Sequence, residues 1–130
     1  MTTDNINDTY KTIPMRRSDI DQSVSKEAKY FFELYLQDGL FSQYEITRSD
    51  ITIGRDANNA LAIPQADNTS RIHAKLSFDE KEDSYLIEDL DSKNGVFVNK
   101  KKVSSHLLKP DDLIQLGDLK LVFKVAKAVN

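Results

Sequence analysis

The sequence predicts an all-β fold, a β-sandwich of antiparallel and mixed sheets. Apolar and polar residues alternate in many short segments, which is the pattern of strands that bury one face. Turn-forming Gly, Pro, Asn and Asp residues separate these segments at close spacing, as in sandwiches and barrels. No long helical pattern lies between the segments, which argues against a parallel α/β sheet. A chain of 130 residues suffices for one domain with a hydrophobic core.

The strands are predicted from this alternation, in order along the chain. Residues 30–36 come first, and Gly39 is expected to form the turn that follows. The remaining strands are expected over residues 41–47, 51–54, 60–63, 72–78, 85–90, 96–99, 102–103, 113–116 and 119–126. In the segment 72–78, one face is expected to hold Ile72, Ala74, Leu76 and Phe78, and the other His73, Lys75 and Ser77.

Two further segments are interpreted as turns. The dipeptide Asn94-Gly95 is a strong signal for a tight hairpin turn. The basic run from Lys100 to Lys102 is interpreted as the solvated tip of a hairpin.

The domain organisation is predicted as a flexible polar tail over residues 1–27, followed by one folded domain over residues 28–128. The tail is rich in Thr, Asp, Asn and Ser and has almost no apolar periodicity. A short helical turn is a secondary expectation around residues 18–29, where Ser18 could cap the first turn and acidic residues follow.

Composition narrows the class of function. The chain has no Cys, so disulfides and thiolate metal sites are excluded. The net charge of −3 argues against a nucleic-acid backbone as the main partner. No apolar run approaches membrane-spanning length, and the first residues lack the apolar centre of a signal peptide, so we expect no membrane partner and a cytoplasmic location.

Three polar motifs stand where predicted strands begin or end. They are Gly54-Arg55, Ser70-Arg71-Ile72-His73 and Ser92-Lys93-Asn94-Gly95. A phosphate ester carries nearly two negative charges and strong acceptor oxygens, so its site needs a guanidinium, hydroxyl or amide donors and backbone N–H groups. Loops at one end of a sandwich can bring such groups together. Taken singly, Arg55 is also compatible with an ordinary surface arginine, Ser70 with a turn residue and Lys93 with an exposed lysine.

Catalysis is not expected. Ser70 and His73 are three residues apart, and on one strand their side chains would face opposite sides of the sheet. His106 is the other histidine and has no local acidic pattern, so no zinc site or other metal site is predicted, and no cofactor.

The ordered set of motifs resembles the forkhead-associated (FHA) domain family. That family's pattern is a Gly-Arg, a Ser-Arg-x-His, an Asn-Gly and a closing Gly-Asp hairpin, and the resemblance extends over residues 30–126. It implies an FHA-type β-sandwich that binds phosphothreonine peptides through loops at one end. Two departures are Val96, where the family often has Thr, and the segment Lys-Pro-Asp-Asp at residues 109–112, where many members have Gly-Asp.

The resemblance also implies roles for individual residues. Arg55 would pair with the phosphate, Ser70 would donate its hydroxyl, and Arg71 would add charge or a backbone contact. Lys93 would touch the phosphate or the peptide, and Asn94 would hydrogen-bond the peptide main chain. The expected supporting residues are Gly54, His73, Gly95 and Asn99.

The expected function is therefore a phosphothreonine-dependent protein-binding module that acts downstream of a Ser/Thr protein kinase. The alternative is a phosphate-independent interaction or assembly domain. Within the tail, Thr3, Thr9 and Thr12 are candidate phosphorylation sites, and a phosphorylated tail could occupy the chain's own pocket. The competing interpretation is that a polar, Thr-rich tail is merely disordered.

Overall fold

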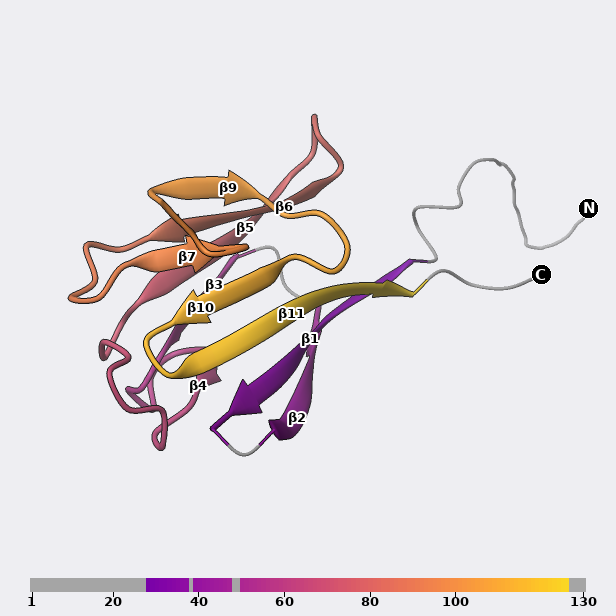
Figure 1. The fold of residues 1–130 in the computed structure, drawn as a ribbon. Helices are drawn as coiled ribbons and strands as arrows, with labels where there is room; N and C mark the ends of the chain where they lie inside the picture. Colours follow the sequence, from indigo (N-terminus) through magenta and orange to yellow (C-terminus); the bar gives the residue numbers. More distant parts are fainter. Residues whose placement is uncertain (1–27, 38, 48–49, 127–130) are drawn as a thin grey trace, which may run out of the picture. The chain divides into compact units, whose positions relative to one another are not determined.

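The protein is described here by a computed structural model, which covers residues 28–37, 39–47 and 50–126. These residues hold eleven strands and no helix, and Tyr30–Lys124 form a compact unit (Figure 1). The strands are β1 Lys29–Leu36, β2 Gly39–Ile46, β3 Asp50–Gly54, β4 Leu61–Ala62, β5 Ala74–Asp79, β6 Ser84–Asp89, β7 Val96–Val98, β8 Lys101–Val103, β9 Ser105–Leu107, β10 Leu113–Leu116 and β11 Leu119–Ala126. None of the described residues belongs to a helix long and apolar enough to cross a membrane.

The strands form two sheets, so the predicted β-sandwich is confirmed. One sheet has the strand order β2-β1-β11-β10-β7-β8, and the other has the order β4-β3-β5-β6-β9. The second sheet is mixed, because β4 pairs with β3 in parallel while β5 pairs with β3 and β6 antiparallel.

The core lies between the two sheets, where the alternation of the sequence places the apolar faces. Phe32 and Phe123 come from the six-stranded sheet and Tyr85 from the five-stranded one, and all are buried. The rings of Tyr85 and Phe123 meet edge to face with centroids 6.2 Å apart, which is a favourable aromatic geometry. Burial also raises the pKa of Tyr85 above the ordinary value of a tyrosine.

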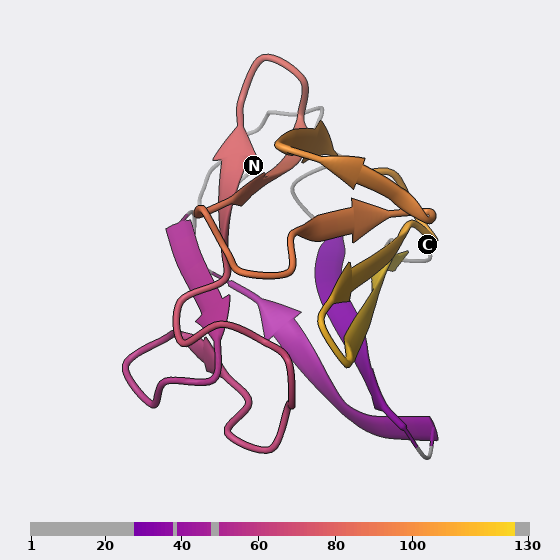
Figure 2. The same cartoon turned by 60° about the vertical axis from the view of Figure 1, so that its left-hand side comes forward.

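The register of the five-stranded sheet brings three loops together at one end of its strands. Ile53 pairs with Ala74, and Ala74 pairs with Asp89, so the end of β3, the start of β5 and the end of β6 lie side by side. The loops that leave these strand ends are therefore neighbours. Figure 2 shows the long loops between β3 and β5, coloured magenta to pink, at the lower left.

Several strand predictions were wrong in detail. The strand predicted over residues 72–78 begins only at Ala74: Ile72 lies in the preceding loop and is 52% exposed, whereas His73 is fully buried. Gly39 begins β2 instead of forming a turn, and the predicted strands at 60–63 and 96–99 shorten to β4 and β7. The strand β9, which pairs with β6, was not predicted.

The hairpin predicted at Asn94-Gly95 is also wrong. This dipeptide connects β6 to β7, which belong to different sheets and do not pair. The two-residue hairpin turn lies at Asn99 and Lys100 instead, where both residues have positive φ, 50° and 73°, as a type I′ turn requires. Of the basic run interpreted as a hairpin tip, Lys100 lies in the turn, whereas Lys101 and Lys102 belong to β8.

The predicted tail lies outside the described residues, and with it Thr3, Thr9 and Thr12. The same holds for the helical turn expected around residues 18–29, except that Lys29 begins β1.

Candidate anion-binding site

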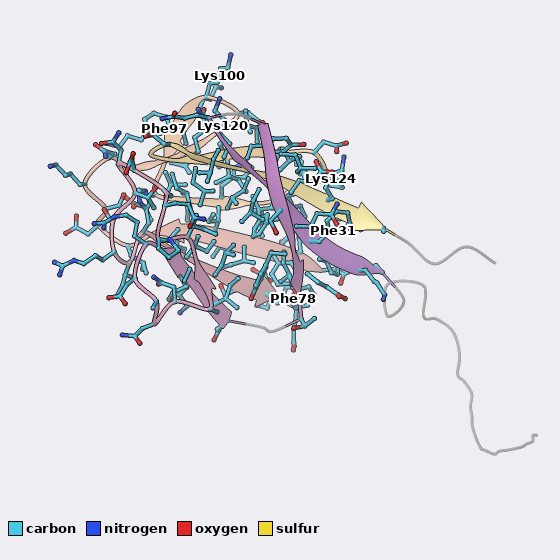
Figure 3. The ribbon with its side chains drawn as sticks, turned by 90° about the horizontal axis from the view of Figure 1, so that it is seen from below. Phe31, Phe78, Phe97, Lys100, Lys120 and Lys124 are labelled. Atoms are coloured by element: carbon cyan, nitrogen blue, oxygen red, sulfur yellow. The ribbon has the colours of Figure 1, made fainter. Side chains whose placement is uncertain are left out.

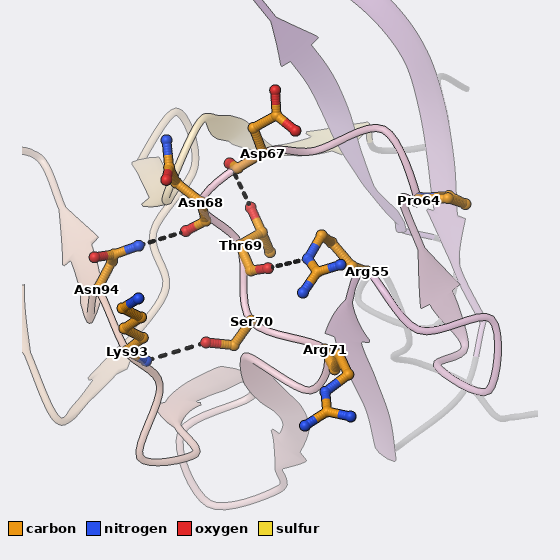
Figure 4. Close-up of a pocket in the computed structure, with 9 residues that line it drawn as sticks. All are labelled: Arg55, Pro64, Asp67, Asn68, Thr69, Ser70, Arg71, Lys93 and Asn94. Atoms are coloured by element: carbon orange, nitrogen blue, oxygen red, sulfur yellow. Dashed lines mark hydrogen bonds between the residues drawn. The ribbon is translucent and has the colours of Figure 1, made fainter.

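A polar pocket of about 470 Å³ lies among the loops that follow β3, β4 and β6 (Figure 4). Its lining residues are Arg55, Pro64, Asp67, Asn68, Thr69, Ser70, Arg71, Lys93 and Asn94. The five residues that the sequence nominated as contacts are all among them, although they come from three separate loops. We refer to this hollow as the anion pocket.

Arg55 is held in the anion pocket by its own loop and by the loop after β4. Its backbone N–H donates to the carbonyl of Ser70 at 3.1 Å, and its Nε donates to the carbonyl of Thr69 at 2.6 Å. Within the described residues, the two terminal Nη groups make no hydrogen bond, and the side chain is exposed. The guanidinium is thus fixed in place while its fork stays free for an external acceptor.

Thr69 anchors this wall of the pocket to the other sheet. The side chain is buried, and its hydroxyl donates to the carbonyl of Leu116 at 2.5 Å. Gly117, the next residue, lies so close to the loop that an added Cβ would stand 2.0 Å from the carbonyl oxygen of Asn68. The loop before β5 is therefore fixed against the β10–β11 turn.

His73 joins two of the pocket's loops from beneath. Its Nδ1 accepts the backbone N–H of Ser70 at 3.0 Å, so the ring proton must sit on Nε2, which donates to the carbonyl of Gly95 at 2.7 Å. The imidazole thus meets the backbone of Ser70 and not its hydroxyl, an arrangement that does not activate the hydroxyl as a nucleophile.

The hydroxyl of Ser70 is directed to the third loop. Its Oγ accepts the backbone N–H of Lys93 at 3.0 Å. Because this bond uses an oxygen lone pair, the hydroxyl proton remains available to a ligand.

Asn94 is oriented in a similar way. Its Nδ2 donates to the carbonyl of Asn68 at 2.7 Å, and among the described residues Oδ1 remains available as an acceptor. The side chains of Asn94, Lys93 and Arg71 are all exposed, and Figure 4 shows Arg71 at the lower edge of the pocket. Three cationic groups therefore line the anion pocket against the single carboxylate of Asp67.

The supporting residues differ in what they support. Gly54 permits the loops after β3 and before β5 to meet, since an added Cβ would stand 2.2 Å from the carbonyl oxygen of Arg71. The side-chain amide of Asn59 holds the same two loops together, because its Nδ2 donates to the carbonyl oxygen of Arg71 at 2.7 Å. Asn99 braces a different loop, because its side chain bonds Asp112 and the N–H of Leu113.

Sequence reasoning missed Pro64, Asp67, Asn68 and Thr69 as lining residues. Asn68 adopts a positive φ of 61°, and the partner of Thr69 lies 47 residues along the chain, so no local motif marks either residue. Among the described residues, no group of three or more His, Asp or Glu side chains is arranged to hold a metal ion.

Fold and pocket together define a two-sheet sandwich with a cationic pocket built from loops at one end. A model of the FHA domain family matches residues 51–117, more than half of the chain. The chain therefore belongs to the FHA domain family.

Curated relatives match the same region. The human protein called angiogenic factor with G patch and FHA domains 1 is 34% identical over 83 residues, which are 57% of this chain and 12% of the human protein. Its mouse counterpart is 33% identical over 86 residues, with 59% and 12% covered. This chain thus spans about an eighth of the length of these relatives.

Solved structures agree with the family. An FHA structure described under phosphothreonine-dependent FHA domain interactions superposes with a TM-score of 0.65 and 27% identity, covering 74% of this chain and 95% of that one. EmbR of Mycobacterium tuberculosis, solved with a low-affinity phosphopeptide, superposes with a TM-score of 0.65 and 25% identity, covering 78% and 26%.

The close approach at Gly54 predicts a steric penalty for Gly54→Ala. The new methyl would meet backbone that cannot rotate away, so we expect a loss of roughly 1–3 kcal/mol in the free energy of unfolding. Gly39→Ala is the matched control, because that Cβ meets no atom within 4 Å and only the positive φ of 115° is unfavourable. Urea unfolding of both variants measures the difference, and a Gly54→Ala protein as stable as wild type would contradict the packing.

Proposed function

We propose that this FHA domain is a phosphothreonine-dependent protein-binding module that acts downstream of a Ser/Thr protein kinase. The observation that carries the proposal is the anion pocket, where cationic and hydroxyl groups from three loops converge. A phosphothreonine carries about −1.5 to −2 charge near neutral pH and three acceptor oxygens, which match these donors.

Each lining group has a role that follows from its free atoms. The Nη groups of Arg55 are free to form a two-pronged contact with phosphate oxygens, because Nε already bonds Thr69. The hydroxyl of Ser70 would donate its proton to a phosphate oxygen, and the ammonium group of Lys93 would add positive charge. Oδ1 of Asn94 would accept a main-chain N–H of the peptide, and Arg71 would contribute charge from the pocket's edge.

The proposed activity is recognition without catalysis, cofactor or metal, in the cytoplasm. The contact of His73 with the backbone of Ser70 supports this proposal, since it leaves the hydroxyl without a general base. The two solved relatives described with phosphothreonine or phosphopeptide also support it. Nucleic acid is not among the proposed partners of a chain with net charge −3.

The tail adds a proposed mode of regulation. Phosphorylation of Thr3, Thr9 or Thr12 would place a phosphothreonine on the same chain as the pocket. A tethered ligand acts at an effective concentration in about the millimolar range, so it would compete strongly with a partner.

Arg55→Ala should abolish detectable binding of phosphothreonine peptides. A hydrogen bond to a charged group contributes about 1.5–3 kcal/mol, and the lost fork makes two, so affinity should fall by roughly 100-fold or more. Arg55→Lys should retain only part of the wild-type affinity, because lysine keeps the charge but cannot form the two-pronged guanidinium contact. Calorimetric titration measures the loss, with Lys81→Ala in the turn after β5 as an exposed control. If Arg55→Ala bound as tightly as wild type, or if binding to a partner survived phosphatase treatment, the proposal would be contradicted. The alternative of a phosphate-independent interaction domain would then be favoured.

Phosphoserine peptides should bind more weakly than phosphothreonine peptides of the same sequence. A buried methyl group contributes about 0.8 kcal/mol, so we expect a difference of roughly fourfold. Titration of a matched peptide pair against wild-type protein measures it, and equal affinities would count against a threonine-selective pocket.

Phosphorylation of the tail should weaken binding of an added phosphothreonine peptide. The chain would be prepared with phosphothreonine incorporated at one position at a time, and titrated beside the unmodified chain. An Arg55→Ala version of each chain is the control, since its pocket would hold neither ligand. Identical affinities for modified and unmodified wild-type chains would remove the switch and leave the binding module intact.

A further inference from the structure

Two further hollows continue from the anion pocket across the outer face of the six-stranded sheet. The first, of about 460 Å³, shares Asn68 and Asn94 with the anion pocket. It is also lined by Phe97, Lys100, Gln115, Gly117 and Asp118. The second, of about 550 Å³, shares the last three of these residues and reaches Tyr35 and Leu36 on β1. We call these two hollows together the sheet groove.

The sheet groove combines apolar surface with lysines that have no ion pair among the described residues. Its apolar part comes from side chains that alternate outward from the core, such as Phe97 on β7 and Val122 on β11. Within the described residues, the ion pairs are His106–Asp112 and Lys124–Asp111, so Lys100 and Lys120 are left without a paired carboxylate. Figure 3 shows Phe97, Lys100 and Lys120 on the same side of the ribbon.

Another cation lies beside the junction of the two hollows, next to the shared residue Asn94, although it is not a lining residue. The side chain of Lys102 crosses over Gly95, with Nζ 3.6 Å from the place of an added Cβ. The acidic lining residue is Asp118, whose carboxylate accepts a hydrogen bond from the Asn68 side chain at 3.2 Å. The lining of the groove thus holds two lysines, Lys100 and Lys120, against one aspartate, whereas the whole chain has a net charge of −3.

We propose that the sheet groove binds an acidic segment of the same partner chain that places its phosphothreonine in the anion pocket. The proposal rests on the proposed function of that pocket. Two observations carry it: the groove is continuous with the pocket through Asn68 and Asn94, and its charge complements carboxylates. The partner is therefore a phosphoprotein with an acidic, partly apolar flank.

The strand order sets the length of this segment. From β7 the groove crosses β10 and β11 to reach β1, which is three steps between neighbouring strands. At about 4.8 Å a step, the crossing is roughly 14 Å, or about four residues of extended chain. A short phosphopeptide would therefore fill the pocket but leave most of the groove empty.

Synthetic peptides test the proposal. One peptide carries a run of about six glutamates on the amino side of phosphothreonine, a second carries it on the carboxyl side, and matched peptides have glutamine instead. We expect one glutamate peptide to bind wild-type protein roughly 3- to 30-fold more tightly than its glutamine match, as two or three exposed ion pairs would allow.

Charge-reversed variants separate the groove from general electrostatics. In the double variant Lys100→Glu, Lys120→Glu, the preference for glutamate over glutamine should fall to near one. Lys81→Glu makes the same kind of charge change in the turn at the opposite end of β5 and should keep the preference. The proposal is overturned if neither glutamate peptide binds more tightly than its match, or if the double variant keeps the preference. Loss of all binding in Arg55→Glu would support the pocket's function whatever the groove variants show, so the two proposals can fail separately.

Discussion

The buried imidazole of His73 is the interaction on which the pocket depends. It accepts from the backbone of Ser70 and donates to the carbonyl of Gly95, so one ring joins the loop that enters β5 to the loop that enters β7. These strands belong to different sheets. Both backbone groups are polar, and leaving each without a partner would cost about 1–3 kcal/mol. The histidine therefore shapes a pocket that it does not itself line.

The loops around His73 are fixed by contacts from both sheets, which makes the pocket preorganised. Thr69 reaches the carbonyl of Leu116, Arg55 reaches the carbonyl of Thr69, and the backbone of Lys93 reaches Ser70. The bond of Arg55 uses Nε and leaves its Nη groups, and the bond to Ser70 uses an oxygen lone pair and leaves the hydroxyl proton. Donors held in this way lose little conformational entropy when an anion arrives, so more of the interaction energy remains as affinity.

Local patterns predicted what depends on local structure. Alternation identified the strands that carry Phe32, Leu76 and Phe123, because a half-buried strand must alternate. The motifs identified five residues from separate loops that line one pocket. Asn94-Gly95 was misread as a hairpin because a positive φ at Gly95 is common to many turns and does not say which strands follow. The hydrogen bond from Thr69 to Leu116 spans 47 residues. It could not be inferred, because no local pattern in a single sequence shows which carbonyl group accepts from a buried hydroxyl.

The β10–β11 turn connects the anion pocket to the sheet groove physically. Gly117 packs against the carbonyl of Asn68 on one side and lines both groove hollows on the other. Asp118 bonds the backbone of Asp67 through its N–H and the side chain of Asn68 through its carboxylate. A ligand that presses on this turn from the groove therefore acts on the loop that positions Arg55 and Asn94. Phosphate affinity and flank preference would then be coupled, because contacts that share a rigid element are not independent in free energy.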